Sequence, residues 1–321
     1  MRRGRTSDRC RSVLDETSFD FRGISDREIE EHLDVLCDGL ETIRGASHPD
    51  LTIESPSTLW DVECLDGCAF CDFLCSPRAS GVSRDTRVRL QQILNKLQEL
   101  DSRPEDTSVR VDGAEATHAV SVAHALERTV AGHCTACMVF GAVSRRGLLP
   151  VTGSAGRASV FFFAEPSCLP DFWRHVLRYE DISEKYFFEL CEVAFPALRM
   201  HPDLAFRRFD GKYSDLRERV VQVLSGLCDH FPAAHRDAQG LPDAVQAALG
   251  PHHVDVSPES PGTHRSDRLR RQRVVEFDGR EHRCEWHAKL ERHRNRIHFA
   301  LIEDGSPGTI LIGIFTSHLD T

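Results

Sequence analysis

The sequence has little lysine and no long hydrophobic segment. Only four of its 40 basic residues are lysines, and this arginine bias, with abundant Ala, Gly and Val, predicts coding in a GC-rich bacterial genome. The longest uncharged apolar run, 158–164, is far too short to span a bilayer. The basic N-terminus is not followed by an apolar segment, so no secretory signal is expected. We therefore expect a cytoplasmic bacterial protein without a membrane partner.

Motifs that would identify several enzyme classes are also absent. The chain has no GxxxxGK[ST] loop, no GxSxG elbow and no HExxH motif. The segment 153–156, Gly-Ser-Ala-Gly, leads into a predicted strand rather than a helix, so it is a poor phosphate-binding loop. The sequence therefore offers no motif for a P-loop nucleotidase, an α/β-hydrolase or an HExxH metalloprotease.

The length and the hydrophobic pattern predict an α+β fold. The 321 residues suffice for two domains, and a hydrophobic content of 40% suits a globular chain. We expect a small α/β N-terminal domain, a central helical segment and a C-terminal antiparallel β-unit of about four strands. The predicted bounds are a flexible tail over 1–24, the α/β domain over 25–168, the helical segment over 169–249, a linker over 250–272 and the β-unit over 273–321.

Two helices of the α/β domain are the clearest local predictions. Ser25 and Glu28 form a capping-box pattern at the start of the first helix. Its apolar positions then recur at helical spacing: Ile29, Leu33, Leu36, Cys37, Leu40 and Ile43. The second helix is expected over 85–100, with Leu90, Ile93, Leu94 and Leu97 as its buried stripe.

The twelve cysteines are candidates for metal binding or burial rather than for disulfides, because the chain is expected to be cytoplasmic. The cluster Cys64, Cys68, Cys71 and Cys75 has spacings at which thiolates can hold zinc. If 68–75 is helical, however, the last three cysteines lie on one apolar face, which favours structural burial. Zinc at this cluster remains the alternative.

Two further cysteine patterns are weaker candidates. His133-Cys134-x2-Cys137 lies in an apparent strand, whereas a redox CxxC should open a helix. In His282-x-Cys284-x2-His287, strand alternation directs the last histidine away from the other two side chains. The first pattern leaves metal or redox chemistry as the weaker alternative, including a four-cysteine site with Cys68-x2-Cys71, whereas the second predicts no shared metal site.

Along the predicted C-terminal strands, apolar and polar side chains alternate between even and odd positions. Trp286, Ala288 and Leu290 share an apolar face with Cys284, whereas Glu285, His287 and Lys289 share the other face. In the next strand, Ile297, Phe299 and Leu301 alternate with Arg296 and His298. A period of two predicts an apolar face on a core and a charged, histidine-bearing face toward solvent.

This polar face is the main candidate site. We expect His287 and His298 to transfer protons and Glu285 to orient a histidine. Basic side chains would hold phosphate, namely Lys289, Arg292, Arg294 and Arg296. Together they are the parts of a metal-independent ribonuclease, which His318 could join. The alternative is an ordinary solvated sheet face with cross-strand charge pairs.

Charge is spread unevenly along the chain. Residues 264–298 contain eleven basic and six acidic side chains, whereas the whole chain has a net charge of -10. A basic segment on an acidic body suggests an anionic partner, which could be RNA, DNA or an acidic protein surface. The alternative is a solvated linker at 265–273.

The C-terminal strand order, with a basic stretch before Arg296-Ile-His-Phe and a closing Ile-Leu-Ile-Gly-Ile-Phe, resembles the small sheet of RelE/ParE-type bacterial toxin domains. The resemblance covers residues 273–321. It implies action on ribosome-bound mRNA through basic residues on the concave face, here Lys289, Arg292, Arg294, Arg296 and His298. The family's two N-terminal helices are not evident directly upstream. The whole chain also resembles uncharacterised bacterial proteins with Cys-Glu-Trp-His and a His-Leu ending, which implies no activity.

Three functions follow from these patterns. The leading hypothesis is a cytoplasmic protein whose C-terminal β-unit engages RNA or the ribosome, as a metal-independent ribonuclease of a toxin or phage-defence type. The second is a non-enzymatic binding or assembly subunit with a protein partner, in which the basic C-terminal unit is an interaction module. The third is a zinc-stabilised regulator that uses the cysteines of residues 64–75.

Overall fold

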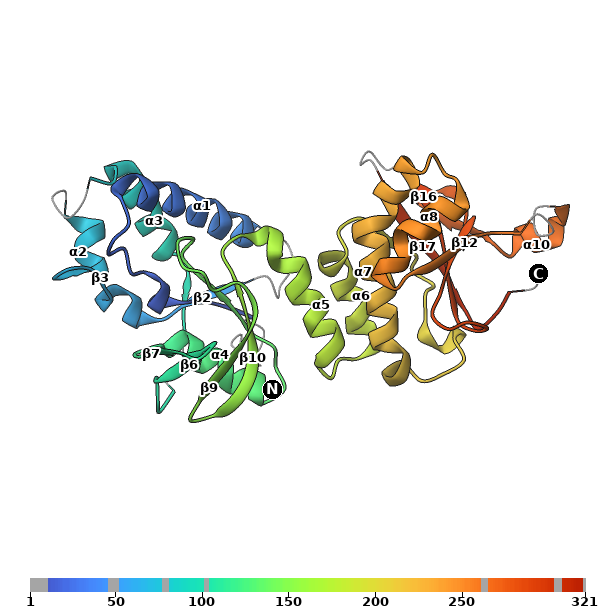
Figure 1. Ribbon diagram of the computed structural model, residues 1–321. Coiled ribbons are helices and arrows are strands. Elements are labelled where there is room, and N and C mark those ends of the chain that lie inside the picture. The colour runs from blue at the N-terminus through green and yellow to red at the C-terminus, as the bar shows by residue number, and fades with distance from the viewer. Residues whose placement is uncertain are drawn as a thin grey trace. The chain divides into compact units, whose positions relative to one another are not determined.

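The computed structural model describes residues 11–45, 52–76, 81–100, 104–260, 265–302 and 308–319. The chain has an α+β fold, which confirms the predicted fold class. It divides into two compact units, Met1–Phe172 and Trp173–Thr321 (Figure 1). No helix in the described ranges is both long and apolar enough to cross a membrane.

The N-terminal unit is built on one mixed sheet. Its strand order is β5-β2-β1-β8-β10-β9-β6-β7. The first five strands are parallel: β5 (Gln98–Glu99), β2 (Ile53–Ser55), β1 (Ser12–Leu14), β8 (Ala136–Met138) and β10 (Gly156–Phe163). The other three extend the sheet in antiparallel pairs: β9 (Gly147–Gly153), β6 (Val109–Val111) and β7 (Ala114–Ala116).

Helices cover both faces of this sheet. Cys137 of β8 belongs to the core beneath α4 (Val120–Val130), whereas the next residue, Met138, faces α1 (Asp26–Gly45). A Cβ atom on Gly39 of α1 would come within 2.9 Å of the Met138 methyl carbon, so glycine permits this close approach. The remaining elements of the unit are α2 (Phe70–Cys75), α3 (Arg84–Leu94), β3 (Glu63–Leu65), β4 (Cys68–Ala69) and the 3-10 turns η2 (Glu16–Ser18), η3 (Ser57–Asp61) and η4 (Pro166–Cys168).

Helix α1 confirms its sequence signature. The Ser25 hydroxyl oxygen accepts a hydrogen bond from the backbone N–H of Glu28, and the Glu28 carboxylate accepts one from the Ser25 N–H. All the apolar positions predicted for this helix are buried. Helix α3, in contrast, ends at Leu94 rather than at residue 100. The segment after it pairs with β2 as strand β5, so non-local strand pairing overrides the local helical pattern.

The prediction of a flexible tail over 1–24 is wrong for its described part, residues 11–24. Ser12–Leu14 form β1, which lies between β2 and β8 in the middle of the sheet. Phe19 and Phe21, which follow it, are fully buried. A three-residue strand that is buried on both faces has no period-two pattern, which is why the sequence did not reveal it.

The C-terminal unit is built on a second sheet with the order β11-β17-β16-β15-β12. The strands are β11 (Leu198–Met200), β17 (Thr309–Thr316), β16 (Arg296–Ile302), β15 (Trp286–Lys289) and β12 (Asp255–Pro258). Only the β11–β17 pair is parallel. The sheet therefore takes strands from the predicted helical segment and linker as well as from the predicted β-unit.

The helices of this part are α5 (Leu169–Tyr179), which begins in the N-terminal unit, α6 (Glu184–Ala194), α7 (Tyr213–Asp237), α8 (Pro242–Leu249) and α10 (Asp267–Arg271), with 3-10 turns η5 (Phe206–Arg208) and η6 (Gly250–His252). Helix α7 packs on the apolar face of the sheet. The ring of its Phe231 lies 5.3 Å from that of Trp286 and 4.9 Å from that of Phe299.

The predicted linker over 250–272 is another correction. Its described residues include η6, β12 and α10, and only 261–264 are outside the description. The predicted hairpin turn at Asp278-Gly279 is confirmed: it joins β13 (Val274–Phe277) to β14 (Arg280–Arg283), and both turn residues have positive φ. The turn expected at 304–308 lies mostly outside the described residues.

Candidate metal centre in the C-terminal unit

The two candidate histidines lie opposite each other on neighbouring strands. The register of β15 and β16 pairs His287 with His298 and Lys289 with Arg296. This is the register that brings the predicted polar faces together. The two imidazole rings are 5.3 Å apart between centroids. Strand alternation thus places both rings on the face opposite α7.

The histidine pair is not exposed to solvent, which contradicts the expectation for this face. His287 is 8% exposed and His298 is 1% exposed. Two buried charged residues lie against them: Glu259, which follows β12, and Arg273, which precedes β13. Farther along the same face, Val275 and Phe277 of the β13–β14 hairpin pack on apolar residues of β16 and β17.

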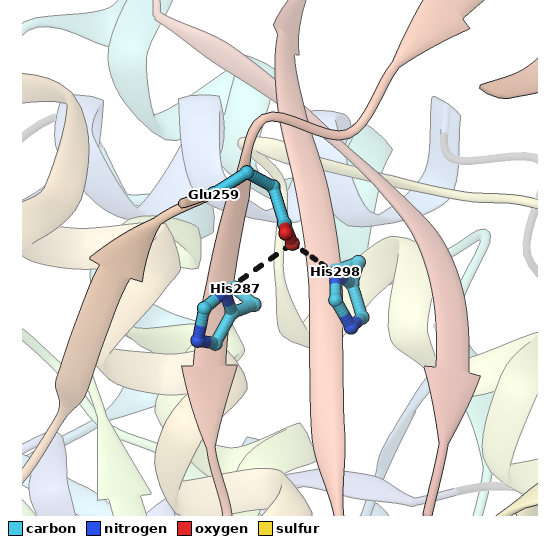
Figure 2. Close-up of side chains that lie close together, drawn as sticks. All are labelled: Glu259, His287 and His298. Carbon is cyan, nitrogen blue, oxygen red and sulfur yellow. Dashed lines mark ion pairs between the residues drawn. The ribbon is translucent and has the colours of Figure 1, made fainter. Parts of the chain in front are cut away.

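Glu259 brings a carboxylate to the histidines. Its backbone N–H donates a hydrogen bond of 2.8 Å to the carbonyl oxygen of Glu285, which extends the β12–β15 pairing by one residue. The Oε1 atom then lies 3.0 Å from Nδ1 of His298 and 3.4 Å from Nδ1 of His287, as Figure 2 shows. The carboxylate therefore contacts both imidazoles with the same oxygen atom.

Arg273 holds the other carboxylate oxygen. Its Nε lies 2.6 Å from Oε2 of Glu259. The arginine is fixed in place because its Nη1 donates to the carbonyl oxygen of Leu269, and its own carbonyl oxygen accepts from the N–H of Cys284. The carboxylate is thus oriented with Oε2 toward the guanidinium and Oε1 toward the imidazoles.

The contacts between Glu259 and the histidines have the distances of ion pairs but not the angles of hydrogen bonds. Glu259 Oε1 and the Nδ1 atoms of His287 and His298 are buried without a well-directed hydrogen bond to any described group. His298 Nε2 is also buried without a well-directed hydrogen bond to any described group. Buried polar atoms normally have hydrogen-bond partners, so Glu259 Oε1 and the two Nδ1 atoms, which face one another, call for an explanation, such as an ion; Nε2 lies on the far side of the His298 ring from Glu259 (Figure 2).

These three residues could hold a metal ion. One ligand atom from each of Glu259, His287 and His298 lies within 4.8 Å of the other two. Among the described residues, no other group of three or more Cys, His, Asp or Glu side chains meets this condition. Imidazole and carboxylate are ligands for zinc and for several other transition metals.

Electrostatics favour the ionised form of Glu259 and the neutral form of His298. Burial opposes the charge of Glu259, but contacts with the two histidines and the charge of Arg273 outweigh it and hold the pKa of the carboxyl well below its usual range. Burial also lowers the pKa of His298, and the nearby carboxylate offsets this only in part. Glu259 is therefore ionised at neutral pH, as a carboxylate ligand must be, whereas the neutral form of His298 that burial favours would lower the pKa of Glu259 less than a charged histidine does.

The remaining predicted site residues lie outside this centre. Glu285 is exposed and pairs with Arg283 at 3.7 Å, so the carboxylate that contacts the histidines is Glu259 instead. The exposed His318 also lies apart from the centre.

Two of the four predicted phosphate-binding residues are engaged with acidic side chains. Lys289 pairs with Asp255 at 3.1 Å. Arg294 pairs with Asp210 at 3.0 Å and also contacts Glu291. Arg292 is exposed, whereas Arg296 is half-buried.

The cysteine cluster of the N-terminal unit is not brought together as a metal site. The helix α2 buries Phe70, Phe73 and Leu74 rather than its cysteines. Cys64 is buried, Cys68 and Cys71 are half-buried and Cys75 is exposed, so the expectation of one buried cysteine face is wrong. Burial raises the pKa of the Cys64 thiol to about 12, which disfavours the thiolate. The CxxC cysteines Cys134 and Cys137 are both buried near β8.

Sequence reasoning missed Glu259 and Arg273. Glu259 lies in a segment rich in Pro and Ser, where no periodic pattern marks a strand. Arg273 was grouped with the exposed arginines before it, although it is 2% exposed. No family model, no curated protein and no solved structure matches this chain.

Proposed function

We propose that the C-terminal unit is a metal-binding module in which Glu259, His287 and His298 hold one zinc ion. The observation that carries this proposal is the set of buried ligand atoms that face one another without hydrogen-bond geometry. The sequence suggested zinc only as an alternative, and at the cysteine cluster. The proposed zinc site lies instead on the histidine face of the C-terminal sheet.

The separations of the ligand atoms suit this proposal. Zinc–ligand distances of about 2.0–2.2 Å and tetrahedral angles separate neighbouring ligand atoms by about 3.3–3.6 Å. Glu259 Oε1 lies 3.4 Å from one Nδ1 atom and 3.0 Å from the other. These two separations are close to the tetrahedral values, and all three ligand atoms lie within 4.8 Å of one another.

The centre would have three protein ligands and one further coordination position. Since Arg273 already neutralises the charge of Glu259, a divalent ion would leave the buried cluster with a net positive charge, which is costly in an apolar surrounding. We therefore expect an anionic fourth ligand such as hydroxide. The three residues come from β15, β16 and the end of β12, so zinc would also link three neighbouring strands and stabilise the unit.

Metal content tests the proposal. The full-length protein and its Glu259→Gln and His298→Ala variants would be loaded with zinc, freed of weakly bound metal by gel filtration and measured by plasma mass spectrometry. His293→Ala is the matched control, since His293 is exposed in the β15–β16 connection. We expect one zinc ion per chain in the wild type and the control, and less than about a tenth of that in the other two variants. Equal zinc in all four proteins, or none in the wild type, would contradict the proposal.

RNA binding is a second candidate function, supported by the exposed arginines of the C-terminal unit. Those between residues 265 and 294 are Arg265, Arg268, Arg270, Arg271, Arg280, Arg292 and Arg294. Arginine side chains on a surface contact phosphates and give affinity that does not depend on base sequence. The resemblance to RelE/ParE-type domains also favours this candidate, because two helices, α7 and α8, do precede β12 in this unit.

RNA cleavage by His287 and His298 is less well supported than RNA binding. Both histidines lie beneath Glu259 and Arg273, so a phosphodiester would reach them only if those segments moved away. We therefore propose that the protein acts in the bacterial cytoplasm and binds RNA through these arginines. The histidine pair would not contact the RNA.

Fluorescence anisotropy with a labelled single-stranded RNA at several salt concentrations tests this second candidate. The Arg271→Ala/Arg292→Ala variant should bind more weakly and with a smaller salt dependence, by about one unit of slope for each lost phosphate contact. Arg157→Ala, which changes an exposed arginine of the N-terminal unit, should bind like the wild type. Equal affinity in all three proteins would exclude this surface and favour a protein partner.

A further inference from the structure

The N-terminal unit has a topological switch point in its parallel sheet. The chain runs from β1 to β2 and then to β5 on one side, and it returns to β8 and then β10 on the other side. The direction of winding therefore reverses between β1 and β8. In open α/β sheets, ligands bind in the crevice outside the carboxyl ends of the strands at such a reversal.

A cavity of about 680 Å³ lies at this position within the N-terminal unit. It is lined by Glu16 and Thr17, which directly follow β1, and by Arg145, which follows β8. Thr117 and His118, just before α4, complete this side of the wall. The volume is in the range of pockets for small molecules, about 300–1,000 Å³.

Glu16 is the buried polar group of this cavity. It is 1% exposed, and its carboxylate accepts the Ser121 backbone N–H near the start of α4 at 3.2 and 3.3 Å. Asp15 and the buried thiol of Cys137 lie close to it, and the other charged or titratable groups of the wall are Asp20, Arg22, Asp61, Glu63, Glu115, His118 and Arg145. Burial, together with the charge of Asp15, raises the pKa of Glu16 to about 7, although the hydrogen bonds from Ser121 act in the opposite direction.

Five acidic side chains and two arginines line the cavity. Arg145 is bound to Asp15, whose side chain is fully buried, at 2.7 Å. The Nε and Nη2 atoms of Arg22 donate hydrogen bonds of 2.8 and 2.7 Å to the carboxylate of Asp20. The cationic groups of the wall are thus neutralised by adjacent carboxylates, whereas the wall also contains Asp61, Glu63 and Glu115. Cavities lined by one sign of charge concentrate ligands of the opposite sign.

We infer that this cavity binds a small molecule with an ammonium or guanidinium group, which is held by Glu16 at the switch point between β1 and β8. The hydroxyls of Thr58 and Thr117 in the wall supply additional hydrogen-bond partners. This site lies in the N-terminal unit and does not depend on the proposed zinc centre.

Binding should release a proton and depend on pH. A bound cation favours the ionised carboxylate of Glu16. In the free protein, about one-tenth of this carboxyl is ionised at pH 6, one unit below its pKa of about 7, and about nine-tenths is ionised at pH 8. Affinity should therefore increase about tenfold from pH 6 to pH 8, and this increase should vanish in a Glu16→Gln variant.

Isothermal titration of the full-length protein with spermidine and, separately, with arginine tests the inference at pH 6 and pH 8. We expect at least one of these probes to bind with a stoichiometry of one, about tenfold more tightly at the higher pH. Glu16→Gln should weaken binding at pH 8 about tenfold. Glu115→Gln, which changes an exposed wall residue and leaves the core intact, should weaken it about threefold.

The control is Glu105→Gln, since Glu105 is an exposed acid of the same unit outside the cavity. It should bind both probes like the wild type. Absence of binding by both probes would overturn the inference. So would binding of several equivalents that Glu16→Gln and Glu115→Gln leave unchanged, since this would be general attraction to an acidic surface.

Discussion

Replacement of Glu16 by glutamine should stabilise the N-terminal unit at and above neutral pH. The pKa of this carboxyl is raised from 4.5 to about 7 in the folded protein, so the folded state binds the proton more tightly than the unfolded state. Stability from this group is full below pH 4.5 and is lost as the pH rises through 7. The shift corresponds to a loss of about 3 kcal/mol above pH 8. Glutamine is neutral throughout and can still accept the Ser121 N–H.

The difference between wild type and Glu16→Gln isolates this effect from other titrations. Burial, with a smaller contribution from the charge of Arg128, lowers the pKa of His124 on α4 to about 4. That group destabilises the unit as the pH falls below 6.5, which is the opposite trend. It is common to both proteins, so it cancels in the difference.

Hydrogen exchange measured by mass spectrometry is the suitable assay, because the chain has two units and a single unfolding transition is not expected. Peptides covering β1 and α4 should exchange more slowly in Glu16→Gln at pH 8, with an opening free energy up to about 3 kcal/mol higher. At pH 5 the two proteins should differ little. A difference that is the same at both pH values, or a variant that is less stable at pH 8, would refute the reasoning.

Three further predictions concern the packing of the C-terminal unit. Arg273→Met should destabilise it by about 3–5 kcal/mol, since it leaves the buried carboxylate of Glu259 without its partner; a normal urea midpoint would contradict this ion pair. Phe231→Ala should cost about 3–5 kcal/mol by opening a cavity between α7 and the sheet, and a loss below 1 kcal/mol in the same assay would contradict this packing. Gly313→Ala should lower the melting temperature because its Cβ would clash with the Cys284 sulfur, and Cys284→Ala should restore part of the loss; no rescue would show that another contact is responsible.

Elements with a strong local signal were predictable from the sequence. Helix α1 combines a capping box with a regular apolar stripe, and the β13–β14 hairpin has an Asp-Gly turn that needs two positive φ values. The alternation within β15 and β16 likewise predicted which residues share a face, but Cys284, which precedes β15, lies beside Val275 of the hairpin and not with Trp286 as expected. In each case the determinants lie within a few residues of one another.

Elements that depend on distant partners were not predictable. Strand β1 is three residues long and becomes a strand through pairing with β2 and β8. β12 lies in a Pro- and Ser-rich segment and pairs with β15 across the intervening hairpin. Because residues 250–272 were predicted to be a linker, Glu259 was not included in the candidate site. For the same reason the histidine face was expected to be exposed, whereas Glu259 and Arg273 cover it.

The most direct test of the zinc centre is X-ray absorption at the zinc edge on the zinc-loaded full-length protein. The account predicts a coordination shell of nitrogen and oxygen atoms only, at about 2.0–2.2 Å, with the outer-shell scattering of two imidazole rings, and loss of this signal in His298→Ala. A shell with sulfur atoms at about 2.3 Å would contradict the account, because it would place the metal on cysteines instead of on Glu259, His287 and His298.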